Sequence, residues 1–161
     1  MTSNQNALPE IGISQILGLV ELLMARNGRE DIYKLAGELS MELGETLTVI
    51  KAAELLGLIN TPGGDVVVED FGQKVIDASI TERKDLIRAK LEELPVFKNV
   101  REFLAAQEDS EVAREEVLEK LAELIPNEDA ESSFTTIVNW GRYSELFGYN
   151  DDTQTFYLGG E

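Results

Sequence analysis

Hydrophobic residues recur at helical spacing over most of the chain. In the first such stretch, Ile11 to Ala25, four apolar residues form one stripe: Ile16, Leu19, Val20 and Leu23. Asn27-Gly28 is a frequent C-terminal signal and is expected to end this helix. A second helix is predicted to open at Glu30-Asp31, and a third to follow the short connection 40–44. Their expected buried residues are Ile32, Leu35, Ala36 and Leu39, then Leu47, Ile50, Leu55 and Leu56.

The hydrophobic period changes after Gly57. Two short apolar runs, 58–60 and 66–68, flank the turn-forming sequence Thr61-Pro62-Gly63-Gly64 and predict a β-hairpin. Asp70 is expected to cap the next helix, with Gln73 completing a capping box. Three helices, a hairpin and a further helix are typical of a winged-helix domain, so residues 11–80 are predicted to form a winged-helix-like region.

Residues 81–158 are predicted to form a helical extension packed on this region, so that both make one compact unit. Its helices are expected to begin at Thr81, Pro95, Ser110 and Asn127, the last running through Trp140 towards Phe147. Asn150-Asp151-Asp152 indicates a turn, and residues 153–158 alternate like a closing strand. The predicted fold is therefore mainly α, with residues 1–10 as a flexible lead-in and 159–161 as a tail.

Composition limits the possible chemistry. The 161 residues include no cysteine and no histidine, which excludes disulfides, thiol nucleophiles, His-dependent triads and the usual zinc sites. No loop matches the phosphate-binding G-x-x-x-x-G-K-[ST] pattern, and no ligand spacing of an EF-hand occurs. We therefore expect a non-enzymatic protein with no cofactor and no bound metal. Carboxylate-only chemistry stays as a formal alternative.

Charge and hydropathy bear on location and partners. The formal net charge of −17 gives a field that repels phosphate, which argues against nucleic acid or an anionic membrane as the partner. Residues 30–57, which include the predicted helix-turn-helix, hold six acids and two bases. No apolar run approaches the roughly 20 residues of a membrane span, and residues 1–9 lack the pattern of a secretory signal. The expected location is the cytoplasm.

A basic segment is the first candidate binding surface. Residues 81–101 carry six bases, among them Arg83 and Arg88, against four acids. One interpretation is a docking stripe for an acidic partner or a nucleotide. The favoured interpretation is a solvated face that neutralises residues 108–131, which carry ten acids and two bases.

The second candidate surface is aromatic. It comprises Trp140-Gly141-Arg142-Tyr143, Phe147 and Tyr149, and Trp, Tyr and Arg dominate interface hot spots. Alternatively this is a helix buried in the core, which is the favoured interpretation for Trp140 and Phe147. The predicted partner-binding residues from both surfaces are Trp140, Arg142, Tyr143, Tyr149, Arg83 and Arg88.

Three stretches, 16–59, 80–91 and 136–158, resemble the AAA-associated C-terminal domain family. The most specific parts are NGREDIY at 27–33 and W-G-R-Y-x-E-L-F-x-Y at 140–149. The resemblance implies a bacterial or archaeal accessory domain of the ATP-binding subunits of nitrate/sulfonate/taurine-type ABC transporters. It carries over no catalytic residue, because the Walker motifs of those proteins lie in a preceding domain.

The expected function is thus a regulatory or assembly module that contacts an ABC-type importer ATPase, at the inner face of the membrane. Pairing with a second copy as a homodimer is a further option. The alternative function is a winged-helix transcription regulator or ligand sensor, which rests on the helix-turn-helix pattern alone.

Overall fold

The computed structural model describes residues 8–124 and 130–158, and it divides the chain into two compact units. We call residues 11–83 the N-terminal unit. The described part of residues 84–161, together with residues 8–10, is the C-terminal unit. The division falls within helix α5 (Ile80–Leu91). Close packing of the two halves as one body stays a prediction, and the expected lead-in and tail lie mostly outside the described residues.

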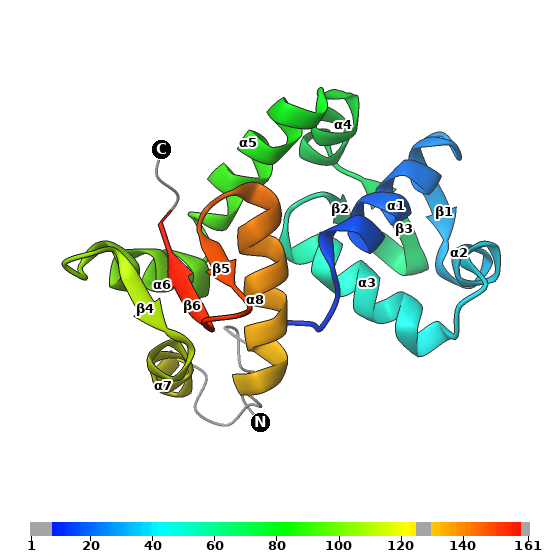
Figure 1. Cartoon of the computed structure of the whole chain (residues 1–161). Helices are drawn as coiled ribbons and strands as arrows, with labels where there is room; N and C mark the ends of the chain where they lie inside the picture. Colours follow the sequence, from blue (N-terminus) through cyan, green and yellow to red (C-terminus); the bar gives the residue numbers. More distant parts are fainter. Residues whose placement is uncertain (1–7, 125–129, 159–161) are drawn as a thin grey trace. The chain divides into compact units, whose positions relative to one another are not determined.

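The N-terminal unit combines four helices with a small antiparallel sheet. The helices are α1 (Ile13–Met24), α2 (Ile32–Leu39), α3 (Leu43–Leu55) and α4 (Asp70–Asp77). The strands are β1 (Arg29–Asp31), β2 (Ile59–Asn60) and β3 (Asp65–Val68), in the spatial order β1-β3-β2. Helix α1 lies beside α3 and the sheet (Figure 1).

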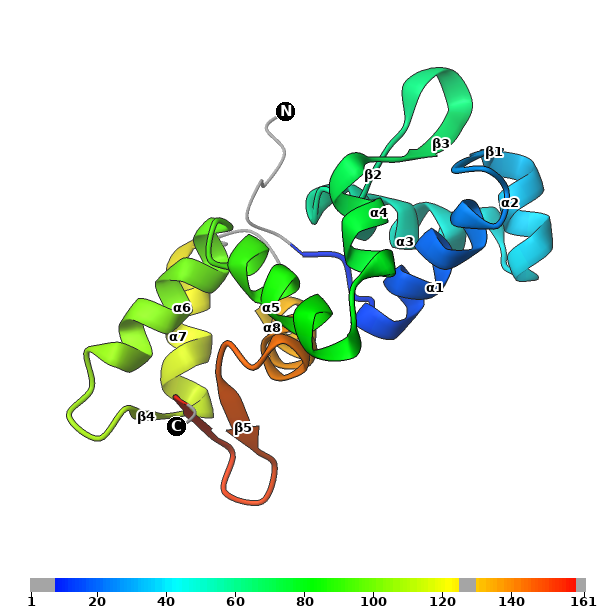
Figure 2. The ribbon, with the colours of Figure 1, turned by 90° about the horizontal axis from the view of Figure 1, so that it is seen from above.

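The predicted hairpin is confirmed. Ile59 and Asn60 pair with Val68 and Val67, and the intervening Pro62–Gly64 forms a single 3-10 turn. The loop extends away from α1, α3 and α4 (Figure 2). Strand β1 was not foreseen, because its three residues lie where the acids Glu30 and Asp31 suggested the start of a helix. Asp31 does cap α2, accepting hydrogen bonds from the backbone N–H groups of Tyr33 and Lys34.

The buried face of α1 is as predicted, whereas that of α3 is partly different. Ile16, Leu19, Val20 and Leu23 are all buried. On α3, however, Leu47 is 45% exposed, so its expected place in the core was wrong. Ile50 is buried as predicted, together with Thr46, Val49, Ala52 and Ala53. Thr46, Val49, Ile50 and Ala53 are spaced as i, i+3, i+4 and i+7 along the buried stripe, and Leu47 lies off that stripe.

The predicted cap of α4 was also wrong. The N-cap is Glu69 rather than Asp70, and the Glu69 side chain makes no capping hydrogen bond. The backbone N–H of Glu69 donates to the carbonyl oxygen of Leu58 at 2.9 Å, which holds Glu69 in an extended conformation. Helical geometry therefore begins only at Asp70. A reciprocal capping box does occur one helix later, between Ser79 and Glu82 at the start of α5.

The C-terminal unit holds further helices and a second small sheet. After α5 come α6 (Pro95–Ala105), α7 (Arg114–Leu124) and α8 (Ala130–Ser144). The strands β4 (Glu111–Ala113), β5 (Gly148–Asn150) and β6 (Thr155–Tyr157) form an antiparallel sheet in the order β4-β6-β5. Helices α6 and α7 lie side by side (Figure 2). The structure confirms Pro95 as the first residue of its helix and the closing strand as β6.

Two predicted helix boundaries in this unit were wrong. Ser110 does not cap a helix: it has a φ of 58°, and its carbonyl oxygen accepts from the Leu158 N–H, which starts the pairing of β4 with β6. The helix begins only at Arg114. Helix α8 ends at Ser144 instead of continuing to Phe147, since β5 follows. The expected cap Asn127 lies outside the described residues.

Four helices end in the same Schellman motif. Two backbone hydrogen bonds close the last turn of α1, α2, α3 and α8. One N–H donates to the carbonyl oxygen five residues earlier, and the N–H of the residue before it donates to the carbonyl oxygen three residues earlier. The left-handed position is occupied by Asn27, Ser40, Gly57 and Glu145 in turn. Asn27 and Gly57 are signals that the sequence makes visible, and the predicted connection 40–44 already placed the end of the second helix before Ser40. The end of α8 at Glu145 was not predicted.

Within the described ranges, none of the helices combines the length and apolar content that crossing a membrane demands.

Candidate partner-binding site

Most of the aromatic segment forms the core of the C-terminal unit. Trp140 is completely buried on α8 and stacks on Phe97 of α6, with 5.7 Å between ring centroids and an interplanar angle of 6°. Phe147 and Tyr149 are also buried. Both pack around Phe156 of β6, at centroid distances of 5.5 and 4.8 Å. Trp140 and Tyr149 therefore fix the position of the end of α8, and their rings are not offered to a partner in this conformation.

A glycine permits the chain to fold back at this point. A Cβ on Gly141 would lie 2.2 Å from the Phe147 ring, so any larger residue would collide with it. Ser144 is also buried, and its hydroxyl donates to the carbonyl oxygen of Trp140 at 2.9 Å. Glu145 then takes the left-handed conformation that turns the chain into Leu146 and Phe147. The W-G-R-Y-x-E-L-F-x-Y segment is thus largely explained by how α8 ends.

Arg142 is the exposed member of this segment. Its guanidinium lies 3.3 Å from the carboxylate of Asp151, and the two side chains are 47% and 73% exposed. Asp151 belongs to the turn after β5, where the Asn150 side chain accepts from the N–H groups of Asp152 and Thr153. This confirms the predicted turn. Tyr143 is half-buried and has contacts of its own, which makes it a weaker candidate than Arg142.

Arg142 and Asp151 line a shallow, open hollow of about 320 Å³. Its other lining residues are Tyr149, Asn150, Asp152 and Tyr157. Tyr157 is 41% exposed, and its ring covers Gly148 on the paired strand, where a Cβ would come within 2.3 Å. Burial raises the pKa of the Tyr149 phenol, an effect opposed by the positive charge of Arg114 and reinforced by Asp151. The hollow therefore presents one cation, two carboxylates and an accessible aromatic edge.

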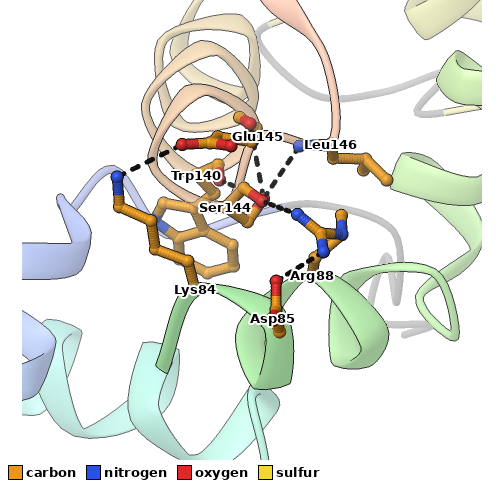
Figure 3. Close-up of polar contacts among 8 residues, drawn as sticks. Lys84, Asp85, Arg88, Trp140, Ser144, Glu145 and Leu146 are labelled. Atoms are coloured by element: carbon orange, nitrogen blue, oxygen red, sulfur yellow. Dashed lines mark hydrogen bonds and ion pairs between the residues drawn. The ribbon is translucent and has the colours of Figure 1, made fainter. Parts of the chain in front are cut away.

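Two basic residues of α5 in this unit, Lys84 and Arg88, are engaged with the end of α8, whereas Lys90 pairs with Glu93. The guanidinium of Arg88 donates to the carbonyl oxygen of Ser144 at 2.9 Å and pairs with Asp85. Lys84 pairs with Glu145 at 3.3 Å (Figure 3). Cations stabilise the carbonyl end of a helix, so Lys84 and Arg88 complete the C-terminus of α8. Because their partners lie outside residues 108–131, the interpretation as a face neutralising that acidic segment was wrong for these two residues.

Arg83 has the same role in the N-terminal unit. Its guanidinium donates to the carbonyl oxygens of Val75 and Ile76, at 3.0 and 2.8 Å, at the C-terminal end of α4. Glu21 lies 3.8 Å away, and the Arg83 side chain is only 18% exposed. Among the six predicted partner-binding residues, Arg142 is therefore the one with the most accessible charge. Partner binding by any of them stays a prediction.

Metal binding receives no support from the described residues, because they contain no group of three or more acidic side chains placed to hold an ion.

A comparison with protein families shows which family the chain belongs to. The family model of the C-terminal AAA-associated domain matches residues 33–150. The chain belongs to this family. The family is, by its description, one of domains associated with AAA-type proteins, so the suspected relationship is confirmed. No curated protein and no solved structure gives a match.

The match to the C-terminal AAA-associated domain runs from α2 to the end of β5 and so draws on both units. It leaves out α1, β1 and β6. All six predicted partner-binding residues fall inside the match, as do Gly141 and Ser144. The residues of α5 and α8 that shape the C-terminal end of α8 therefore lie within the matched region.

Proposed function

We propose that this C-terminal AAA-associated domain is a non-catalytic regulatory or assembly module that binds the ATP-binding subunit of an ABC-type importer. The observation that carries the proposal is the hollow beside Arg142, Asp151 and Tyr157, held by a rigid aromatic core. Binding would occur in the cytoplasm, where the importer would bring the module to the inner face of the membrane. Family membership supports the choice of an ATPase as the partner.

The nature of the hollow favours a protein over a small molecule. Sites for small ligands are concave and bury most of the ligand, whereas this hollow is shallow and open. Arginine and tyrosine are frequent hot-spot residues, and both are accessible here. The exposed pair of Arg142 with Asp151 contributes at most about 1 kcal/mol to stability, so exchange of Asp151 for a partner carboxylate costs little. The buried Trp140 anchors the part of α8 that carries Arg142, so little backbone entropy is lost there on association.

The absence of catalysis is part of the proposal. The sequence has no histidine and no cysteine, and the acids around the hollow face an arginine and solvent. A purified sample that hydrolysed ATP, or any substrate of a hydrolase panel, would contradict this part.

The direct test uses the purified ATP-binding subunit encoded in the same genome and isothermal titration calorimetry. The Arg142→Glu/Tyr157→Ala double variant is expected to weaken binding by about tenfold or more, since it removes the cation and the aromatic contact of one surface. Lys98→Glu is the matched control, because it also reverses an exposed charge of the C-terminal unit but lies on α6. It should leave affinity within about twofold, roughly 0.4 kcal/mol.

Two results would overturn the proposal: no binding of the unmodified chain to the purified subunit, or equal affinity of the double variant and the unmodified chain. Light scattering on the same samples identifies a homodimer, the alternative form of protein contact.

The topology of the N-terminal unit raises a second candidate function, that of a winged-helix transcription regulator or ligand sensor. We propose that this unit is a winged helix, because two helices joined by a short turn precede an antiparallel hairpin that pairs with β1. A DNA-reading role would then place α3 in the major groove. The exposed residues of α3 include Glu45, Leu47 and Glu54 with the single base Lys51, which disfavours that role. Titration of the protein with a labelled DNA duplex at low salt tests this role, because phosphate contacts are strongest at low salt. Binding that is undetectable under these conditions would exclude it.

A further inference from the structure

Helix α3 carries two exposed leucines on one face. Leu43 is 37% exposed and Leu47 is 45% exposed, and residues four apart lie one above the other on a helix. Lys51 continues the same row by one more turn. A single exposed leucine on a soluble protein needs no explanation, but a row at this spacing is the form in which helices present anchors to a partner helix.

This face is held rigidly. At its N-terminal end Glu42 and Glu45 form a capping box, with the Glu45 carboxylate 3.3 Å from the Glu42 N–H. At its C-terminal end Gly57 closes a Schellman motif. Between them Val49, Ile50 and Ala53 are buried. The two leucines are therefore exposed on a well-anchored helix, and their exposure does not arise from fraying of a helix end.

The charge around the leucines restricts the partner. The N-terminal unit has twelve acids against six bases. Its three arginines are already engaged: Arg26 with Glu38, Arg29 with Asp65, and Arg83 with Glu21 and the end of α4. Glu42 and Glu45 remain exposed at the end of α3 that carries the leucines. A partner thus needs an apolar centre and a positively charged rim.

The same charges disfavour the other possible occupants. A symmetric contact with a second copy would bring two such patches into one interface, where Glu42 and Glu45 of both copies would be offset only by Lys51 of each. Duplex phosphates and anionic lipids would meet the same repulsion. We propose that the Leu43–Leu47 face of α3 docks a basic amphipathic helix of a protein partner. This inference rests on the N-terminal unit alone and holds whether or not Arg142 contacts an importer ATPase.

The test uses the full chain and a designed probe. The probe is a labelled peptide of roughly five helical turns, with leucines at i, i+3, i+4 and i+7 and lysines elsewhere. A second peptide has the same composition but a permuted order without the leucine stripe. Fluorescence anisotropy at about 0.15 M salt should give a dissociation constant about tenfold lower for the striped peptide. The permuted peptide measures the attraction that charge alone produces.

Variants connect this binding to α3. Leu43→Ser/Leu47→Ser is expected to raise the dissociation constant of the striped peptide about tenfold, because it removes both anchors. Ile80→Ser is the matched control: Ile80 is 74% exposed in the same unit but lies on α5, and its loss should change the constant less than about twofold. Far-ultraviolet circular dichroism checks that each variant is folded.

Three outcomes would overturn the inference: equal affinity for both peptides, unchanged affinity in the double leucine variant, or an equal loss in Ile80→Ser. A concentration-dependent dimer that the double leucine variant abolishes would assign the face to a second copy, and would overturn it as well. Backbone amide shifts of residues 42–51 on addition of the striped peptide provide independent support.

Discussion

The guanidinium of Arg88 on α5 donates to the carbonyl oxygen of Ser144 at 2.9 Å and so caps the last turn of α8. The carbonyls at the end of a helix lack partners within the helix, and the negative end of its dipole lies there. In this chain the bond also connects a residue of the predicted basic stripe to the aromatic segment. The two features that the sequence suggested as separate binding surfaces are thus joined at one structural point.

Loss of this bond should be measurable. Arg88→Ala is expected to lower the free energy of unfolding by about 1–2 kcal/mol, since hydrogen bonds of charged groups contribute about 1.5–3 and this side chain is one-third exposed. Arg88→Lys should recover part of the loss, because it keeps the charge but loses the second donor. Urea unfolding followed by the fluorescence of Trp140, the only tryptophan, reports on this unit. Lys98→Ala, an exposed change on α6, should stay within about 0.5 kcal/mol.

The sequence predicted the long periodic elements well. The stripe of α1, the hairpin and the start of α6 at Pro95 were all visible, because each depends on residues close together in the chain. The strands β1, β4 and β5 were missed. Each has only three residues, too few to display an alternating period. The partners of β1 and β4 are also distant in sequence, whereas β5 pairs with the neighbouring β6.

The candidate site was predictable only in part. Composition identified Trp140 and Arg142 as hot-spot types, but it did not reveal that Trp140 stacks on Phe97 while Arg142 stays exposed. Likewise, Leu47 has a more hydrophobic side chain than Ala52, yet Ala52 is the buried one. Such choices depend on the shape of the neighbouring helix, which no local pattern contains.

Gly141 is expected to be intolerant of any side chain. In Gly141→Ala the new methyl group would lie 2.2 Å from the Phe147 ring, which is 2% exposed and packed on Phe156. The expected loss is about 2–3 kcal/mol, the upper range for overpacking. Gly148→Ala meets the half-exposed Tyr157 ring, which is able to rotate away, so its loss should be smaller.

A positive control for alanine substitution is available in α1. Gly18 lies inside this helix with nothing near its Cβ position, so Gly18→Ala should raise stability by about 0.5–1 kcal/mol. Equal effects of Gly141→Ala and Gly18→Ala on the urea midpoint would contradict the proposed role of Gly141.

Glu145 offers a stabilising substitution. It has a φ of 62°, a conformation that costs a residue with a side chain about 1 kcal/mol relative to glycine. Its ion pair with Lys84 is exposed and contributes at most about 0.5 kcal/mol. Glu145→Gly is therefore expected to raise stability by about 0.5 kcal/mol or more. Lys84→Ala measures the ion pair separately. If Glu145→Gly lowers the urea midpoint more than Lys84→Ala does, then relief of the left-handed backbone conformation contributes less to stability than the ion pair does.

The raised pKa of the Tyr149 phenol predicts a change in stability that is confined to alkaline pH. Burial raises the pKa of its phenol, so the folded state holds the proton at pH values where the unfolded chain, with a pKa of about 10, has lost it. The unfolded state then binds fewer protons, and stability falls as pH rises above about 10. Below that pH both states are protonated and the group has no effect. Tyr149→Phe should therefore match the unmodified chain near neutral pH and lose less stability above pH 10. Parallel declines of the two proteins in urea unfolding across that range would mean that the Tyr149 phenol ionises as readily in the folded state as in the unfolded chain.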